Sequence, residues 1–167
     1  MFGTHDLWLF ILSGLLLNVT PGPDNLFIAT RSISQGWRAG LVASLGVCCG
    51  VFGHVMAAAL GLAALLATSA TAFLVVKLVG AVYLLWLGVG LLRQSGHQAL
   101  PPAQLPPQHL HQLFRQGLLC NLLNPKVALF FLAFVPQFIG HDAENKMLAF
   151  LYLGIIFDLN SLLWCTL

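Results

Sequence analysis

The stretch NVTPGPDNLF, residues 18–27, places a carboxylate beside two prolines inside an apolar segment. Its acid, Asp24, costs about 2.5–3.5 kcal/mol on membrane-insertion scales if it lies at mid-span. Such a residue carries a proton, binds a cation such as a substrate amine, or merely caps a helix. Because Asn or Ser caps a helix without this cost, the sequence favours a functional role for Asp24 over a purely structural one.

The same stretch predicts a break in the backbone. Pro21 and Pro23 remove amide donors from a helix, and Gly22 permits a sharp turn between them. Asp24 and Asn25 are typical N-cap residues, so we expect a second half-helix to begin with the letters NLFIAT. The N-terminus of such a half-helix attracts anions, and irregular backbone at this depth survives only where it is buried or lines a wet cavity.

A second charge lies in another apolar segment. Lys126 follows Asn124 and Pro125 near the middle of the run over about 113–139, and a lysine at that depth needs a partner. Asp24 is the natural candidate. Two interpretations stay open, namely a pair that substrate or protons can open and a fixed pair that only holds helices together.

Two further polar groups interrupt apolar runs. His54 has the chemistry of a proton relay, because imidazole titrates near neutral pH, but a neutral histidine bonded to a neighbouring helix is the commoner case. Asp158 and Asn160 form a polar notch in the last apolar segment. The functional weight of Asp158 depends on how deep that segment places it in the membrane.

Composition identifies the chain as an integral membrane protein. Its 167 residues are 59% hydrophobic and 7% charged, with a mean hydropathy of +0.89, whereas soluble domains carry about 25% charged residues. The net charge of +2 is too small to suggest nucleic acid as a partner. The sequence also has no Gly-rich phosphate loop that would bind ATP.

Five apolar segments predict membrane-spanning helices, since about 20 residues cross the hydrocarbon core. A Pro- and Gln-rich linker over 94–112 separates two units, about 1–93 and about 113–167, of a single transmembrane domain. The last segment is still apolar at Leu167, so we expect a truncated chain whose complete form has six spans. The five expected spans cover about 7–30, 39–67, 72–92, 113–139 and 147–167.

The two units contain similar short stretches. Residues 14–25, GLLLNVTPGPDN, and residues 117–128, GLLCNLLNPKVA, both open with Gly-Leu-Leu and place Asn four residues after the glycine. Three spans per unit insert the second copy upside down, as in many secondary transporters whose matching breaks mark the substrate site. We therefore predict an all-α polytopic fold of two inverted three-helix repeats, broken at Pro21-Gly22-Pro23 and at Asn124-Pro125.

The remaining motifs indicate structure rather than chemistry. The four cysteines lie in apolar runs without a disulfide pattern, and the three linker histidines have no nearby acidic or thiol partner that would suggest a metal. Small residues from Gly46 to Gly61 predict close helix packing. Lys and Arg near the short loops favour an N-terminus outside, with the first and third loops in the cytoplasm. These cysteines and histidines are Cys48, Cys49, Cys120, Cys165, His97, His109 and His111.

Three stretches resemble, in this order, signature blocks of the lysine exporter (LysE/RhtB) family of bacterial amino-acid efflux proteins. They are TPGPDNLFIATRSISQGWRAGLVASLGVCCG, LVVKLVGAVYLLWLGVGLLR and GLLCNLLNPKVALFFLAFVPQF, within a similarity that runs from about Leu7 to Phe157. Residues 21–25 match the first family motif and residues 124–126 the second. The resemblance, to the homoserine- and threonine-type branch, implies an inner-membrane exporter of amino acids such as homoserine, threonine or leucine.

The resemblance further implies a secondary transporter rather than an enzyme, driven by the proton gradient, with about six spans, an oligomeric state and no cofactor. Its partners would be an amino acid, protons and the lipid bilayer. Because Lys126 repels a cationic side chain, neutral substrates are favoured. Two alternatives from the same superfamily are a thiol–disulfide electron carrier using Cys48 and Cys120, and a metal-ion exporter, which needs more carboxylates in the spans.

Overall fold

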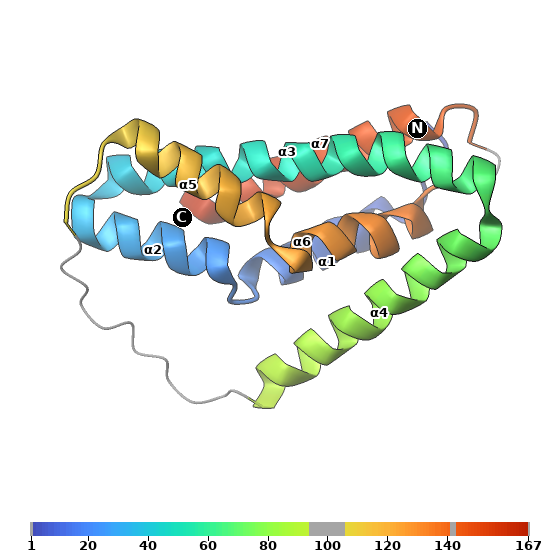
Figure 1. Cartoon of the computed structure of the whole chain (residues 1–167), viewed down its shortest axis with the longest axis horizontal. Coiled ribbons are helices and arrows are strands. Elements are labelled where there is room, and N and C mark those ends of the chain that lie inside the picture. Colours follow the sequence, from blue (N-terminus) through green and yellow to red (C-terminus); the bar gives the residue numbers. More distant parts are fainter. Residues whose placement is uncertain (1, 94–105, 141–142, 167) are drawn as a thin grey trace.

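The computed structural model describes residues 2–93, 106–140 and 143–166, and the secondary structure of these residues is almost entirely helical (Figure 1). The predicted all-α fold is therefore confirmed. An isolated antiparallel bridge joins Thr4 to Ile139. The helices are α1 (Leu7–Val19), α2 (Pro23–Gln35), α3 (Trp37–Thr68), α4 (Ala70–Arg93), α5 (Leu110–Leu122), α6 (Pro125–Leu129), the π-helix η1 (Phe130–Phe134), the 3₁₀ helix η2 (Val135–Phe138) and α7 (Lys146–Thr166).

The expected apolar segments correspond to these helices, but they differ in their ability to span a membrane. Within the described residues, two stretches are long and apolar enough to cross alone, Trp37–Gly61 of α3 and Lys146–Thr166. A third span arises if α5 and the segment Pro125–Phe138, which are bent by 48° at their break, count as one. Helix α1 has 13 residues and a length of roughly 20 Å, so it reaches only part of the way across.

The predicted linker over 94–112 is too long at its C-terminal end. Helix α5 begins at Leu110, because His109 caps it in a capping box with the Gln112 side chain. His109 and His111 stack with ring centroids 5.7 Å apart at this helix start. His97 lies outside the described residues.

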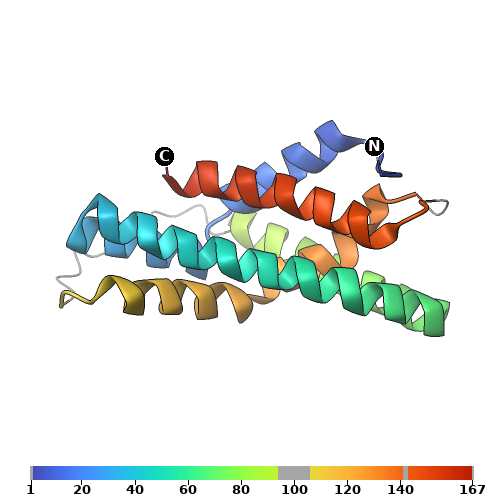
Figure 2. The same cartoon turned by 90° about the horizontal axis from the view of Figure 1, so that it is seen from above.

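The two broken helix pairs, α1–α2 and α5–α6, run in opposite directions along the long axis of the molecule. In Figure 1, α1 and α2 lead from right to left, whereas α5 and α6 lead from left to right, and the two breaks lie near the middle. This opposite orientation agrees with the inverted arrangement predicted from the repeated motif. Figure 2 shows α7 between α1 and α3, with α5 on the far side of α3.

Small residues allow α3 and α5 to pack closely. A Cβ atom on Gly46 would collide with the backbone carbonyl of Phe114, and one on Gly117 would collide with the carbonyl of Ala43. Gly50 likewise faces Asn121, where an added Cβ would lie 2.7 Å from that side chain. The predicted packing role of the small residues on α3 is confirmed for this part of the stripe.

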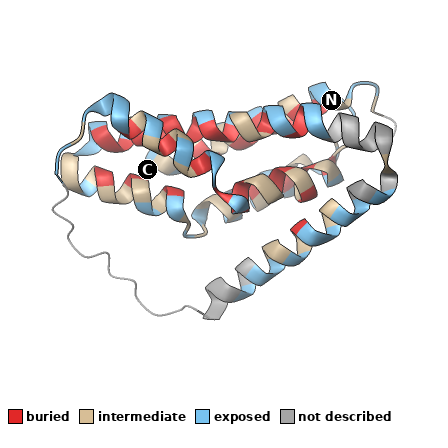
Figure 3. Cartoon of the chain, viewed as in Figure 1, coloured by how far each residue is buried: buried red, intermediate tan, exposed pale blue. Residues whose placement is uncertain are grey.

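An aromatic cluster fills the space between α1, α3, η1 and α7. Its rings include Phe10, Phe130 and Phe157, and the last two have centroids 5.0 Å apart. Buried and exposed positions alternate along these helices (Figure 3). Large apolar side chains such as Trp8, 70% exposed, and Trp86, 69% exposed, cover outer faces, as expected for surfaces that meet lipid.

Candidate functional site

The first break separates α1 from α2 and is built by the Pro-Gly-Pro motif. Gly22 is the N-cap of α2 in an extended conformation, and Pro23 occupies the first helical turn. An N–H at that position has no acceptor within the helix, so proline loses no hydrogen bond there. The prediction that Asp24 and Asn25 cap this half-helix is therefore wrong by two positions. The Asn25 side chain instead donates to the carbonyls of Asn18, at 2.7 Å, and Thr20, at 3.2 Å, at the end of α1.

The second break separates α5 from α6 and follows the same design. Asn124 is the N-cap of α6, and its side-chain oxygen accepts a 3.0 Å hydrogen bond from the Lys126 amide. Pro125 takes the first helical turn, as Pro23 does in α2. The two breaks thus share a proline-started half-helix, although Gly22 caps one and Asn124 the other.

Asp24 lies in the first turn of α2 and is 8% exposed. Its Oδ2 accepts hydrogen bonds from Asn121 Nδ2 at 2.8 Å and from Asn124 Nδ2 at 2.9 Å, both across the interface with the other broken span. The helix dipole of α2 also favours a negative charge at this position. Asp24 Oδ1 is buried and finds no hydrogen-bond partner among the described residues, so it retains an open acceptor.

Lys126 is equally buried, at 8% exposure, and reaches back to the end of α1. Its Nζ donates to the carbonyls of Leu17 and Thr20, both at 3.0 Å. These carbonyls belong to the last turn and C-cap of α1, where the helix dipole favours a cation. An ammonium has three N–H donors, and these two carbonyls are its hydrogen-bond acceptors within the described part of the chain.

The expected ion pair between Asp24 and Lys126 is not formed in this structure. Within the described residues, no oxygen of Asp24 lies within 4.0 Å of the Lys126 ammonium, and each group has neutral partners instead. The physical reason is that each charge already has other partners. The two asparagine amides donate to Asp24, and the carbonyls at the end of α1 accept from Lys126. Both groups nevertheless line one small cavity between the breaks, so the tertiary fold does bring them together.

That shared polar cavity has a volume of only about 20 Å³. This volume holds about one water molecule and is too small for an amino acid. Any larger ligand at these charges therefore requires the half-helices to move apart. Gly22 also lies next to the lysine, since a Cβ atom built on it would lie 3.1 Å from Lys126 Nζ.

The other two candidate residues occupy different places. His54 Nε2 lies 3.0 Å from the carbonyl oxygen of Asn121, so the histidine is bonded to a neighbouring helix and supports the residue that holds Asp24. Asp158 lies beside the Cys48 thiol and outside the lining of the polar cavity. On α7 it is Phe157, Ser161 and Cys165 that line this cavity instead.

Sequence reasoning missed Asn121 as a site residue. Asn121 is 1% exposed and supplies both a side-chain donor to Asp24 and a backbone acceptor to His54. The signal was available, because Asn18 and Asn121 occupy equivalent positions of the repeated motif and both line the polar cavity. The repeated motif therefore indicates both asparagines as candidate site residues.

Two oppositely directed, discontinuous helices with charges at their breaks define the class of membrane transporters with broken spans. The sequence model of the family described as LysE type translocator matches residues 15–167, and the chain belongs to this family. It is therefore a transporter rather than an enzyme.

Individual relatives have similar sequences over most of their length. A Pseudomonas aeruginosa protein named as an uncharacterized membrane protein is 37% identical over 97% of this chain and 77% of its own. A leucine efflux protein of Enterobacter sp. is 31% identical over 98% of this chain and 77% of its own. One of Salmonella choleraesuis is 29% identical over 96% of this chain and 76% of its own. No solved structure matches this chain.

Proposed function

We propose that this chain exports a neutral amino acid across the inner membrane in exchange for protons. The observation that carries the proposal is that two buried, opposite charges at facing helix breaks line one cavity without pairing, each with an unused hydrogen-bonding position. A zwitterion has the complementary arrangement, with an ammonium and a carboxylate on one carbon. Membership of the translocator family and the similarity to proteins named leucine efflux protein support this assignment.

The site can recognise both charged groups of an amino acid. The open Oδ1 of Asp24 is an acceptor for the substrate ammonium, and the third N–H of Lys126 is a donor for the carboxylate. The N-terminus of α2 adds a partial positive charge that also favours the carboxylate. Because the cavity holds about one water molecule, we assign this structure to a closed state that must open to load substrate.

Proton coupling follows from competition at Asp24. The carboxylate binds either a proton or the substrate ammonium, so a proton that arrives from outside neutralises Asp24 and releases the ammonium. The proton then leaves to the cytoplasm and restores the carboxylate for the next substrate. Moving one charge across 100 mV supplies about 2.3 kcal/mol, enough for roughly a 50-fold substrate gradient.

The substrate is expected to have a neutral side chain. Lys126 lies at the site and would repel a second cation, which disfavours lysine and arginine. Among the neutral substrates considered, homoserine, threonine and leucine, we favour leucine and similar apolar amino acids. The similarity to two leucine efflux proteins carries this preference.

The test is an export assay in bacteria that lack their own amino-acid exporters. Cells loaded with a leucine-containing dipeptide should release leucine faster when they express this chain, and a protonophore should remove the difference. Asp24→Asn and Lys126→Met should each abolish release although the protein still inserts. Asp6→Asn is the matched control, because the Asp6 side chain is 61% exposed and lies outside both helix breaks. Normal export by Asp24→Asn would reduce that residue to a structural role.

We also propose that the N-terminus lies outside and the turn between α2 and α3 in the cytoplasm. Arg38, exposed at this turn, and Arg115, exposed on α5, are the cations that support this orientation. Arg31 is buried beside Phe27, with its guanidinium 6.0 Å from the ring centre, so it supports this orientation less than the exposed arginines do. In a cysteine-free background, an impermeant thiol reagent should label Glu144→Cys in intact cells but leave Gly36→Cys unlabelled.

A further inference from the structure

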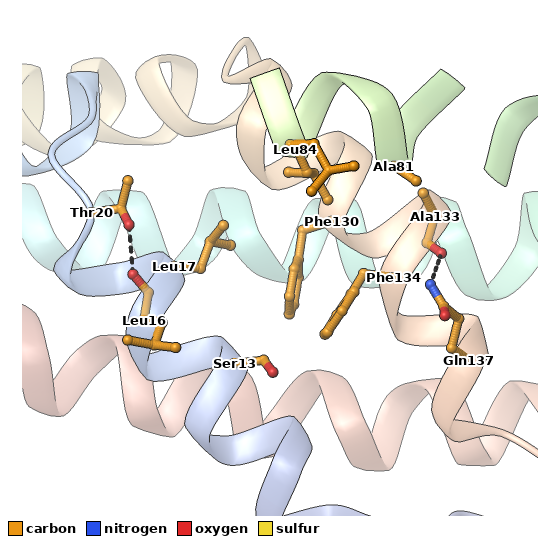
Figure 4. Close-up of a pocket in the computed structure, with 11 residues that line it drawn as sticks. Ser13, Leu16, Leu17, Thr20, Ala81, Leu84, Phe130, Ala133, Phe134 and Gln137 are labelled. Carbon is orange, nitrogen blue, oxygen red and sulfur yellow. Dashed lines mark hydrogen bonds between the residues drawn. The ribbon is translucent and has the colours of Figure 1, made fainter. Parts of the chain in front are cut away.

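A second cavity, of about 480 Å³ (Figure 4), shares the lining residue Leu17 with the polar cavity. It lies between α1, α4 and the π-helix η1. Its volume falls within the range of about 300–1,000 Å³ that is usual for small-molecule sites. The polar cavity, at about 20 Å³, is far smaller.

The walls of this larger cavity are almost entirely apolar, and the residues that line it carry no charge. Phe130 and Phe134 form one wall, stacked with ring centroids 5.1 Å apart. Of its polar lining, Thr20 Oγ1 already donates to Leu16 O at 2.6 Å and Gln137 Nε2 to Ala133 O at 3.0 Å. Such a lining favours an uncharged aliphatic or aromatic group and penalises a charged one.

The apolar cavity lies next to the residues that bind the Lys126 ammonium. Leu17 lines both cavities, and Thr20 lines the larger one. The backbone carbonyls of these same two residues hold the Lys126 ammonium. A molecule whose charged end replaces one of these contacts would therefore have its remaining atoms next to the apolar walls.

The π-helix provides the far wall of this cavity. Short π-helical segments inside longer helices frequently occur at functional sites. Helix α4 packs against this segment through Gly80, where an added Cβ atom would collide with Ala133. This close contact positions the middle of α4, and Ala81 and Leu84 of α4 line the cavity.

We infer that this cavity is the side-chain pocket of the transporter and that it selects apolar, leucine-sized substrates. The inference rests on the proposed function, in which Asp24 and Lys126 hold the charged groups of the amino acid. When the half-helices separate, the side chain of the substrate enters between Phe134 and Leu84. The pocket excludes lysine and arginine because it has no group to neutralise their charge.

Photo-crosslinking tests the position of the side chain directly. The probe is a leucine analogue with a diazirine in its side chain, applied to the full chain in lipid nanodiscs. We expect label in peptides from α1, α4 or η1 that line the cavity, reduced at least tenfold by excess leucine and unaffected by lysine. Label elsewhere, or label that leucine does not displace, overturns the inference and would mark a lipid-filled crevice.

A substitution pair tests specificity in the export assay. Ala81→Phe fills the cavity from α4, so we expect leucine export to fall at least tenfold while alanine export changes less than twofold. The matched control is Val82→Phe, whose side chain is 66% exposed on the outer face of the same helix and should leave both rates unchanged. Equal effects of Ala81→Phe on leucine and alanine would contradict a side-chain pocket.

These experiments separate the pocket from the proposed function. Leucine-sensitive label in the cavity without any export would retain the binding pocket and reject transport of this substrate. Export of leucine together with label outside the cavity would retain the transporter and reject the pocket.

Discussion

Asn121 and Asp24 are 97 residues apart in the chain, yet their side chains share a 2.8 Å hydrogen bond between two oppositely directed broken helices. Asn121 belongs to the last turn of α5 and Asp24 to the first turn of α2. The bond therefore joins the C-terminal end of one half-helix to the N-terminal end of another. It holds the Asp24 carboxylate in place at the charged site.

A double-mutant cycle should detect this bond. Asn121→Ala leaves a buried carboxylate with one fewer donor, which we expect to lower stability by about 1–3 kcal/mol in thermal unfolding in detergent. In an Asp24→Asn background, Asn121→Ala should lower stability by less, and the difference should be at least about 0.5 kcal/mol. This is the smallest interaction energy usual for residues in contact. Additive losses would show that the two side chains do not interact.

Gly22→Ala should impair transport more than folding. Gly22 is extended, with φ −150°, so alanine fits the backbone, but its Cβ would lie 3.1 Å from the Lys126 ammonium. We expect export to fall by roughly tenfold, equivalent to about 1.4 kcal/mol, with nearly unchanged thermal unfolding. A normal export rate would mean that the lysine tip moves aside without consequence.

Gly36→Ala should show the opposite pattern. Gly36 has φ 87° and ψ 173°, a region almost restricted to glycine, and its Cβ would meet no atom within 4 Å. The strain costs about 1–3 kcal/mol, so the unfolding temperature should fall. The fraction of protein that remains folded should export at the normal rate, measured per molecule in proteoliposomes.

Close packing of α3 on α5 can be tested with two glycines of α3. Gly46→Leu forces the helices apart, because even a Cβ atom there collides with the carbonyl of Phe114. We expect little or no folded protein by size-exclusion chromatography. Gly61→Leu is the matched control, since a Cβ atom there meets nothing within 4 Å, and it should yield normal amounts. Equal yields from the two variants would argue against the glycine contact.

His54 should act as a structural hydrogen-bond donor rather than a proton relay. Its Nε2 lies 3.0 Å from the carbonyl of Asn121, an arrangement that a glutamine amide can reproduce in part. His54→Gln is therefore expected to keep proton-driven export with an unchanged pH profile, whereas His54→Leu loses the bond and some stability. A shifted pH profile in His54→Gln would instead favour the relay.

Much of this arrangement could be predicted from the sequence because its signals are local. The apolar segments predicted the helices, and the prolines predicted both breaks, since proline disrupts a helix wherever it stands in the interior. The cap of α2 was placed two residues too late. Proline is preferred just inside a helix start, so Pro23 begins the helix and Gly22 precedes it.

The site itself could be predicted only in part. Burial costs indicated that Asp24 and Lys126 need partners, but those partners lie on distant segments. Backbone carbonyls have no sequence signal, so nothing in the residue types pointed to Leu17 and Thr20 as acceptors. The position of the apolar cavity was likewise beyond sequence reasoning, because Phe130 and Leu84 are as suitable for a lipid-facing surface as for a cavity wall.

The sequence alone indicated a helical membrane protein with two proline-broken helical segments, each carrying a charge inside an apolar run. These features follow from local rules on hydropathy, proline geometry and the cost of charge in lipid. Only the tertiary structure decided which groups surround each charge and where the cavities lie. Hydrogen bonds between residues 97 and 109 positions apart depend on helix packing, which residue spacing does not encode.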